Sequence, residues 1–100
     1  MLCADKSDDF TGKQRPFLIL QKTIYIAAKD SLLVCPISTM LDETGLRVRI
    51  NAGNGLAQDS DIHTDKVSAI RKVRVKQRIG KVNANKMAEV SASLKDWLDL

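Results

Sequence analysis

The stretch that organises this chain is Gln14-Arg15-Pro16-Phe17-Leu18-Ile19-Leu20. A short apolar run bounded by polar residues predicts a buried strand over residues 16–21. Pro16 cannot donate a ladder hydrogen bond, so it belongs at the first position of this strand, and it restricts Arg15 to extended backbone geometry. The sequence therefore predicts a guanidinium fixed at the mouth of a strand. It is either a ligand for phosphate oxygens or the ion-pair partner of a nearby carboxylate.

A second apolar run, residues 32–37, ends in the hydroxyls of Ser38 and Thr39. It predicts another buried strand, in which Pro36 implies an edge position or a bulge. Hydroxyls at a strand end can hydrogen-bond a phosphate, although they are also ordinary turn residues. Two strands that deliver a fixed cation and adjacent hydroxyls to one rim would make a phosphate site.

The middle of the chain alternates between strand and turn patterns. Residues 46–50 alternate apolar and basic side chains, which predicts a half-exposed strand. Two Gly and two Asn within residues 51–55 predict a turn. Strands are expected over 61–64, 67–70 and 73–79, the last with one basic face, although a helical turn over 70–74 is an alternative. Loops are expected over 5–14 and 40–45, a turn at 30–31, and residues 23–28 are β-rich but ambiguous.

The last element is predicted to be a helix. Asn83 is a good N-cap, and an apolar stripe follows at three- and four-residue steps, made of Met87, Val90, Leu94, Trp97 and Leu98. We expect the stripe, Trp97 included, to pack on the core. The predicted fold is a single domain over residues 1–100. It is mostly β with a C-terminal helix, and its several short strands favour a small antiparallel barrel.

Composition narrows the function without defining it. The chain has 100 residues, 44% of them apolar, and a net charge of +4 that leans weakly toward an anionic partner. Two cysteines, Cys3 and Cys35, make no disulfide framework and fit a reduced cytoplasmic setting. With a single histidine, Cys and His alone cannot supply the four ligands of a zinc site. No apolar stretch approaches the roughly 20 residues that cross a membrane. The expectation is a cytoplasmic protein without metal or cofactor.

Two further groups of side chains could carry chemistry. His63, the only histidine, precedes Asp65 by two residues, so on a strand both would face the same side. Such a pair could move protons, or it could be a solvated ion pair. Residues 71–81 hold six cations and no acid. This run could follow a phosphate backbone, dock an acidic protein, or simply be solvated.

Taken in order, these segments resemble the MazF/PemK-like toxin endoribonucleases. Residues 14–16 resemble the family's Arg-Pro strand, residues 34–39 its Cys-Pro-Ile-Thr segment, and residues 65–70 its Asp-Gln-Ile/Val segment. Residues 79–90 resemble the family's final strand and helix. Relative to family members the chain begins near the end of the first strand, so that strand is expected to be short or missing. The resemblance implies a dimeric SH3-like barrel that is related to CcdB.

The resemblance also implies an activity and a set of site residues. The activity is metal-independent, sequence-selective cleavage of single-stranded RNA by attack of the ribose 2′-hydroxyl, restrained by a cognate antitoxin. Arg15 matches the family's catalytic arginine, and Ser38 matches the family's threonine that hydrogen-bonds the phosphate. Asp65 matches an acidic position that some members use in catalysis. His63, which stands where some members have an arginine, is added here by inference. The residues expected to contact RNA are Lys13, Gln14, Thr39, Arg71, Lys72 and Arg74.

Two alternatives remain at this stage. One is a non-catalytic poison of gyrase like CcdB, which would bind through the helix end at Trp97-Leu98-Asp99-Leu100. The other is an inactive relative that binds RNA without cutting it.

Overall fold

The computed structural model of the chain describes residues 2–6, 14–20, 30–41, 47–53 and 55–100. The strands are β1 (Leu2–Lys6), β2 (Gln14–Ile19), β3 (Ser31–Ser38), β4 (Val48–Ile50), β5 (Ser60–Ile62), β6 (Ser68–Arg71) and β7 (Val75–Gly80). Two short 3₁₀ helices, η1 (Thr64–Lys66) and η2 (Lys72–Arg74), flank β6, and the helix α2 (Ala84–Leu98) ends the chain.

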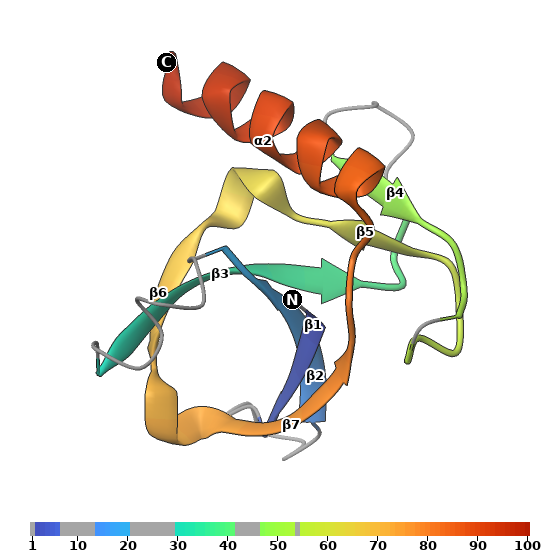
Figure 1. Cartoon of the computed structure of the whole chain (residues 1–100), viewed down its shortest axis with the longest axis vertical. Helices are drawn as coiled ribbons and strands as arrows, with labels where there is room; N and C mark the ends of the chain where they lie inside the picture. Colours follow the sequence, from blue (N-terminus) through green and yellow to red (C-terminus); the bar gives the residue numbers. More distant parts are fainter. Residues whose placement is uncertain (1, 7–13, 21–29, 42–46, 54) are drawn as a thin grey trace.

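The strands form one curled antiparallel sheet in the order β4-β5-β3-β2-β1-β7, and β6 also pairs with β3. Figure 1 shows β1, β2, β3, β6 and β7 arranged around a ring, with α2 lying across one side. Among the described residues no ladder joins β6 to β7, and the chain passes from one to the other through η2. The predicted mostly antiparallel structure with a C-terminal helix is confirmed, but hydrogen bonds do not close the barrel.

The first strand is neither missing nor unpaired. β1 pairs with β2 on one side and with β7 on the other, over Leu2–Lys6. Three residues of the loop predicted over 5–14 lie in strands instead, because β1 continues to Lys6 and β2 begins at Gln14. Residues 7–13 lie outside the described residues. Backbone hydrogen bonds to two neighbouring strands hold β1 in place, although the side-chain pattern of its sequence does not predict a strand. The segment over 23–28 lies outside the described residues, as does most of the loop predicted over 40–45.

β2 and β3 are buried on both faces, which explains their continuous apolar runs. On one face, Leu18, Cys35 and Ile37 pack with Val48, Ile50, Ile62, Val82 and Val90. On the other face, Phe17 and Ile19 pack with Leu32 and Val34. Cross-strand partners share a face, as Leu18 and Cys35 do. The two strands predicted first from the sequence are therefore confirmed as the centre of the core.

Pro36 does not mark an edge strand, because β3 pairs with β2 on one side and with β5 and β6 on the other. The carbonyl of Pro36 accepts a hydrogen bond from the backbone N–H of His63, at 2.9 Å. A strand residue directs its nitrogen and its carbonyl to the same side. The missing N–H of Pro36 therefore falls where η1 interrupts the neighbouring ladder between β5 and β6.

β7 does not keep the predicted period of two. Ala4 pairs with Gln77 and Asp5 with Val75, so Lys76 is an extra residue opposite β1. A second shift follows, because Cys3 pairs with Arg78 and Leu2 with Gly80. Each shift turns the strand. Val75 therefore packs on one face of the sheet, with Phe17, while Ile79 packs against the cluster on the other. The helical turn considered over 70–74 is present as η2.

The C-terminal helix begins as predicted, with the Asn83 side chain accepting a hydrogen bond from the Lys86 N–H at 2.8 Å. Met87, Val90 and Leu94 pack on the core. Trp97 and Leu98, further along the stripe, are 44% and 57% exposed. The expectation that Trp97 packs in the core is therefore wrong, because the helix extends past the sheet (Figure 1). Among the described residues, no helix is long and apolar enough to span a membrane.

Candidate functional site

A pocket of about 410 Å³ opens where β2 begins and β3 ends. The connection between β4 and β5 forms a second wall, and β7 forms a third. The lining residues are Arg15, Pro16, Ile37, Ser38, Thr39, Gly55, Leu56, Ala57, Gln58, Ser60, Gln77 and Ile79. This volume lies within the range of pockets that hold small ligands. The cation and the hydroxyls singled out in the sequence thus share one pocket.

The strand register explains why Arg15 and Ser38 meet. β2 and β3 pair Ile19 with Val34 and Phe17 with Pro36, and continuing this register by two residues places Arg15 opposite Ser38. Residues directly opposite on neighbouring antiparallel strands have adjacent side chains. Two strand ends therefore bring a guanidinium and a hydroxyl to one rim of the pocket.

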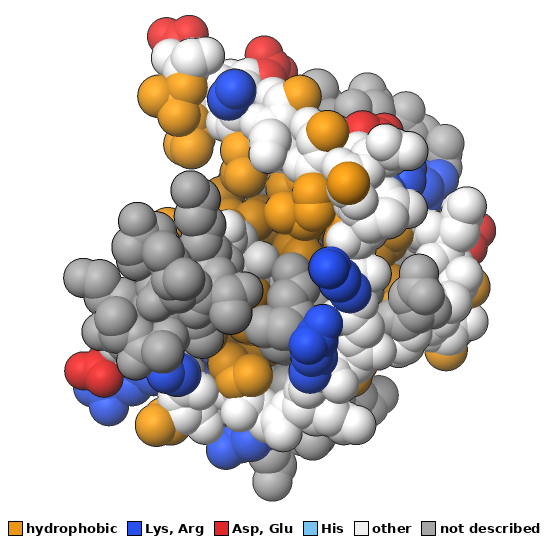
Figure 2. Space-filling view, in the orientation of Figure 1, with side chains coloured by type: hydrophobic (Ala, Val, Ile, Leu, Met, Phe, Trp, Pro, Cys, Tyr) orange, Lys and Arg blue, Asp and Glu red, His pale blue; other side chains and the backbone are white. Residues whose placement is uncertain are grey.

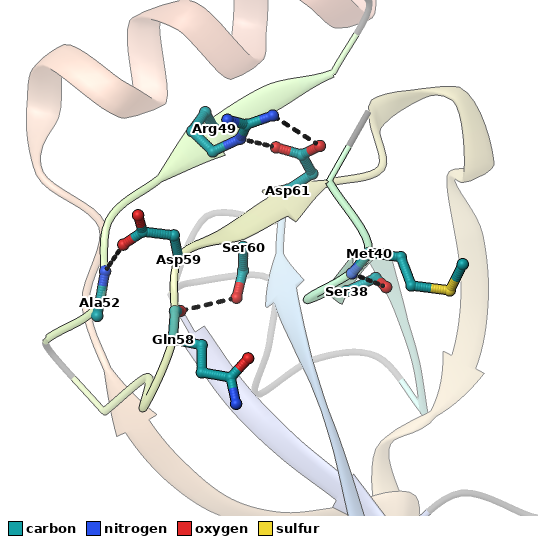
Figure 3. Close-up of polar contacts among 8 residues, drawn as sticks. All are labelled: Ser38, Met40, Arg49, Ala52, Gln58, Asp59, Ser60 and Asp61. Carbon is teal, nitrogen blue, oxygen red and sulfur yellow. Dashed lines mark hydrogen bonds and ion pairs between the residues drawn. The ribbon is translucent and has the colours of Figure 1, made fainter. Parts of the chain in front are cut away.

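The Ser38 hydroxyl is oriented by its own turn. Its Oγ accepts a hydrogen bond from the Met40 N–H at 3.1 Å, as Figure 3 shows. A serine hydroxyl that accepts in this way still has its O–H proton to donate. Arg15 is exposed and Ser38 is half-buried. The rim can therefore present a positive charge and a hydroxyl donor to an anion.

The β4–β5 connection is held against β7 by a close backbone approach at Gly55. A β-carbon at this position would stand 1.9 Å from the Ile79 carbonyl oxygen, and Gly55 has a φ of +95°. Gly53 also has positive φ, and it exchanges backbone hydrogen bonds with Leu56 at 2.8 and 3.0 Å. The turn predicted from the glycines is thus confirmed for its described residues, and it builds one wall of the pocket.

Hydrogen bonds fix further described residues of this connection, as Figure 3 shows. The Ala52 N–H donates to Asp59 Oδ1 at 2.7 Å. The buried Ser60 hydroxyl donates to the Gln58 carbonyl at 3.0 Å. The pocket wall is therefore braced from both ends of the connection.

An ion pair between a partly exposed guanidinium and a buried carboxylate continues the row of Arg15 and Ser38 across the sheet. Ser38 pairs with Asp61 of β5, and Asp61 pairs with Arg49 of β4. Arg49 donates from Nε and a terminal nitrogen to the two carboxylate oxygens of Asp61, which is 1% exposed (Figure 3). Sequence reasoning missed Asp61 because only the strand register shows that it stands beside Ser38.

His63 and Asp65 do not line the pocket. The expectation that they share the face of a strand is wrong, because η1 begins at Thr64 and rotates the backbone between them. His63 is 8% exposed, and its Nε2 has no hydrogen-bond partner among the described residues. Asp65 accepts a hydrogen bond from Arg47 Nε at 3.2 Å. Their part in catalysis stays a prediction.

The surroundings of this pair shift both pKa values downward. Burial lowers the pKa of His63, and the positive charge of Arg47 lowers it further. Burial alone would raise the pKa of Asp65, but the hydrogen bond and charge of Arg47 bring it below its usual value. Burial and the charge of Asp65 raise the pKa of the Cys35 thiol to about 11. At neutral pH the histidine is neutral, the carboxylate is charged and the thiol is protonated.

The other residues expected to contact RNA are spread over the surface. Thr39 lines the pocket. Arg71 ends β6, and Lys72 and Arg74 lie in η2, outside the pocket lining. Gln14 begins β2, and Lys13 lies outside the described residues. Figure 2 shows further Lys and Arg side chains over the course of β7, where Lys76 and Arg78 are exposed. The basic residues form a broad surface rather than one site.

A family model described as PemK-like, MazF-like toxin of type II toxin-antitoxin system matches residues 2–98. The chain belongs to this toxin family. The resemblance that the ordered motifs indicated is thereby confirmed over nearly the whole chain. No significant match was found among curated proteins. Among the described residues, no group of three or more His, Cys, Asp or Glu side chains could hold a metal ion.

Solved structures show the same fold. The Mycobacterium tuberculosis toxin MazF-mt6 superposes with a TM-score of 0.87 at 25% identity, covering 99% of this chain and 96% of that one. A MazE-MazF complex (Form-II) from Deinococcus radiodurans gives 0.81 at 23% identity, with 99% and 91% covered. An endoribonuclease in complex with its cognate antitoxin, from a Mycobacterial species, gives 0.80 at 15% identity, with 99% and 91% covered. At these low identities, the last two structures show only that the fold is shared.

Proposed function

We propose that this chain is the toxin of a type II toxin–antitoxin pair and a metal-independent, sequence-selective endoribonuclease that cuts single-stranded RNA. The observation that carries the proposal is the pocket in which Arg15 lies opposite Ser38. Family membership and a related structure called an endoribonuclease support it. The proposed compartment is the cytoplasm, where the cysteines stay reduced.

The pocket rim supplies what phosphodiester cleavage requires. The ribose 2′-hydroxyl oxygen attacks the adjacent phosphorus and the bond to O5′ breaks, which leaves a cyclic phosphate and a free 5′-hydroxyl. Arg15 neutralises the charge on the phosphate oxygens, and the Ser38 hydroxyl donates a hydrogen bond to one of them. The proton lost by the 2′-hydroxyl is balanced by the proton that O5′ gains, so positioned side chains can complete the reaction.

Cleavage of RNA in the presence of a chelator tests the proposal directly. Arg15→Ala is expected to lower the cleavage rate by roughly a hundredfold, the usual effect of removing a donor that stabilises developing charge. Lys95→Ala is the matched control, because it also removes one positive charge but lies exposed on α2, away from the pocket. Absence of wild-type cleavage, or equal activity of Arg15→Ala, would contradict the proposal. Salt-sensitive binding of RNA that stays intact would instead favour the inactive relative.

A cognate antitoxin and a second copy of this chain are the proposed partners. The support comes from solved relatives that are MazE-MazF complexes. Co-expression with an adjacent antitoxin gene should rescue growth, and light scattering of the purified chain should give twice the monomer mass. Light scattering that gives the monomer mass would remove the homodimer from this proposal.

One observation favours the gyrase-binding alternative. Trp97, Leu98 and Leu100 are exposed at the end of α2, and exposed aromatic and aliphatic side chains often serve protein interfaces. Capture of gyrase by the wild-type chain, lost in Trp97→Ala, together with intact RNA in the cleavage assay, would establish that function instead.

A further inference from the structure

The pocket is lined by two side-chain amides that come from walls other than the β2–β3 rim. Gln58 lies in the β4–β5 connection and Gln77 lies in β7, and both line the pocket with Arg15 and Ser38. Within the described part of the chain, neither side-chain amide has a hydrogen-bond partner. We propose that Gln58 and Gln77 read a nucleobase of the RNA strand next to the phosphate held at the rim. This inference rests on the proposed ribonuclease function.

The sheet places Gln77 in one cross-strand row with two other residues that line the pocket. Gln77 pairs with Ala4, and Ala4 pairs with Pro16. Continuing the β2–β3 register by one residue sets Pro16 opposite Ile37. Pro16, Ile37 and Gln77 all line the pocket. The extra residue at Lys76 turns β7 just before Gln77, and bulges often redirect a side chain in this way beside a functional site.

The β4–β5 connection presents Gln58 from another side. In Figure 3 the side chains of Gln58 and Asp59 leave the connection in different directions. The Asp59 carboxylate accepts a hydrogen bond from the Ala52 N–H. The Gln58 carbonyl is held by the Ser60 hydroxyl at 3.0 Å. The backbone of Gln58 is therefore fixed while its amide stays available to a ligand.

The chemistry of the lining fits a base better than a second phosphate. Among the described residues that line the pocket, Arg15 is the only charged one, and it is at the rim. Ile37, Leu56 and Ile79 offer an apolar surface to the flat face of a base. A glutamine amide carries both donors and an acceptor, so it can pair with two adjacent groups on a base edge. Unstacked bases of single-stranded RNA present those edges to proteins.

Cleavage of a randomised RNA pool, with sequencing of the new ends, tests the assignment. The wild-type chain should prefer one base at a position next to the cut. Gln58→Ala and Gln77→Ala should weaken that preference by roughly tenfold or more, the discrimination typical of a bidentate contact. Gln77→Glu should change the preferred base, because a carboxylate accepts but does not donate. Asn85→Ala, which removes an exposed amide on α2 outside the pocket, should keep the preference.

A binding measurement separates failure of this inference from failure of the proposed function. Short single-stranded RNAs that differ in one base, and one with an abasic position, are titrated against the wild-type chain and each variant. If both glutamine variants cut RNA with an unchanged base preference, or if the wild type cuts without any preference, the base-reading inference is overturned. The proposed ribonuclease function then still holds. Base-dependent binding without cleavage, lost in the variants, supports the inference while the nuclease proposal fails. Absence of both binding and cleavage overturns both.

Discussion

Arg15 and Ser38 at the rim of the pocket differ in their setting from His63 and Asp65 around η1. Arg15 is exposed, and the Ser38 hydroxyl still has a proton to donate. His63 is buried, and Asp65 is engaged by Arg47. Both pairs have residue types that suit catalysis, but of the two it is the first pair that lines the pocket of about 410 Å³ among the described residues. Access to a ligand therefore separates the two pairs better than residue chemistry does.

The η1 region contributes to the fold in a way that the rim does not. The Thr64 and Ser93 hydroxyls are hydrogen-bonded at 2.6 Å and connect η1 to α2. The His63 N–H also connects to β3 through the Pro36 carbonyl. A helix, a strand and a 3₁₀ turn thus meet at this region. We therefore expect changes around η1 to act first on stability, and changes at the rim to act first on activity.

The largest stability effect is expected at Asp61, which lies in the same row as Ser38 but is buried and paired. Asp61→Ala leaves Arg49 without its carboxylate. Breaking a buried ion pair costs about 3–5 kcal/mol, and about 2–3 kcal/mol is expected here because Arg49 is partly exposed and can be hydrated. Urea denaturation measures the change. Cleavage per folded molecule should change little.

Glu89→Ala is the control for Asp61→Ala, because it breaks the exposed Lys86–Glu89 pair, which is separated by 3.0 Å. Exposed pairs contribute about 0–1 kcal/mol. If Asp61→Ala were as mild as this control, burial of the carboxylate would not matter. If Asp61→Ala abolished cleavage without unfolding the chain, Asp61 would belong with the rim.

Sequence patterns predicted the elements of this fold better than their registers. The apolar runs around Phe17 and Val34 and the N-cap at Asn83 depend on local properties, so they were predicted well. The bulge at Lys76 depends on pairing with β1, and the 3₁₀ turn at Thr64 depends on packing against α2. These long-range contacts leave no periodic signal in the sequence. For the same reason the position of Asp61 beside Ser38 and the place of Gln77 in the pocket lining could not be foreseen.

The next effect concerns pH and arises from His63. Its pKa is lowered in the folded chain, so the unfolded chain binds the proton more readily. Stability should therefore be complete above the ordinary histidine pKa of about 6.5 and should decrease as pH falls below it, by at most about 1.4 kcal/mol per pH unit. Asp65, whose pKa is also lowered, contributes stability that is lost only at more acid pH, below about 4.

The contribution of His63 to the pH dependence of stability is measured by denaturing the wild type and His63→Gln between about pH 7.5 and 4.5. This range of roughly three units covers the histidine transition. The variant should lose its pH dependence between about 6.5 and 4.5, while the wild type keeps it. An equal slope in both proteins would show that His63 titrates alike in the folded and unfolded states. Its buried setting would then have no energetic consequence.

The smallest effect is expected at Asp65, and it bears most directly on the comparison between the two pairs. Asp65→Asn removes the charge that pairs with Arg47 at a site where both side chains are partly exposed. Such a pair contributes about 0.2–1 kcal/mol, so a small loss of stability is expected. Because Asp65 does not line the pocket, cleavage should decrease by far less than in Arg15→Ala. If Asp65→Asn unfolds at the same temperature as the wild type but loses as much cleavage activity as Arg15→Ala, Asp65 would instead be assigned to catalysis. The rim and the η1 region would then act as one site, through a conformation in which RNA brings them together.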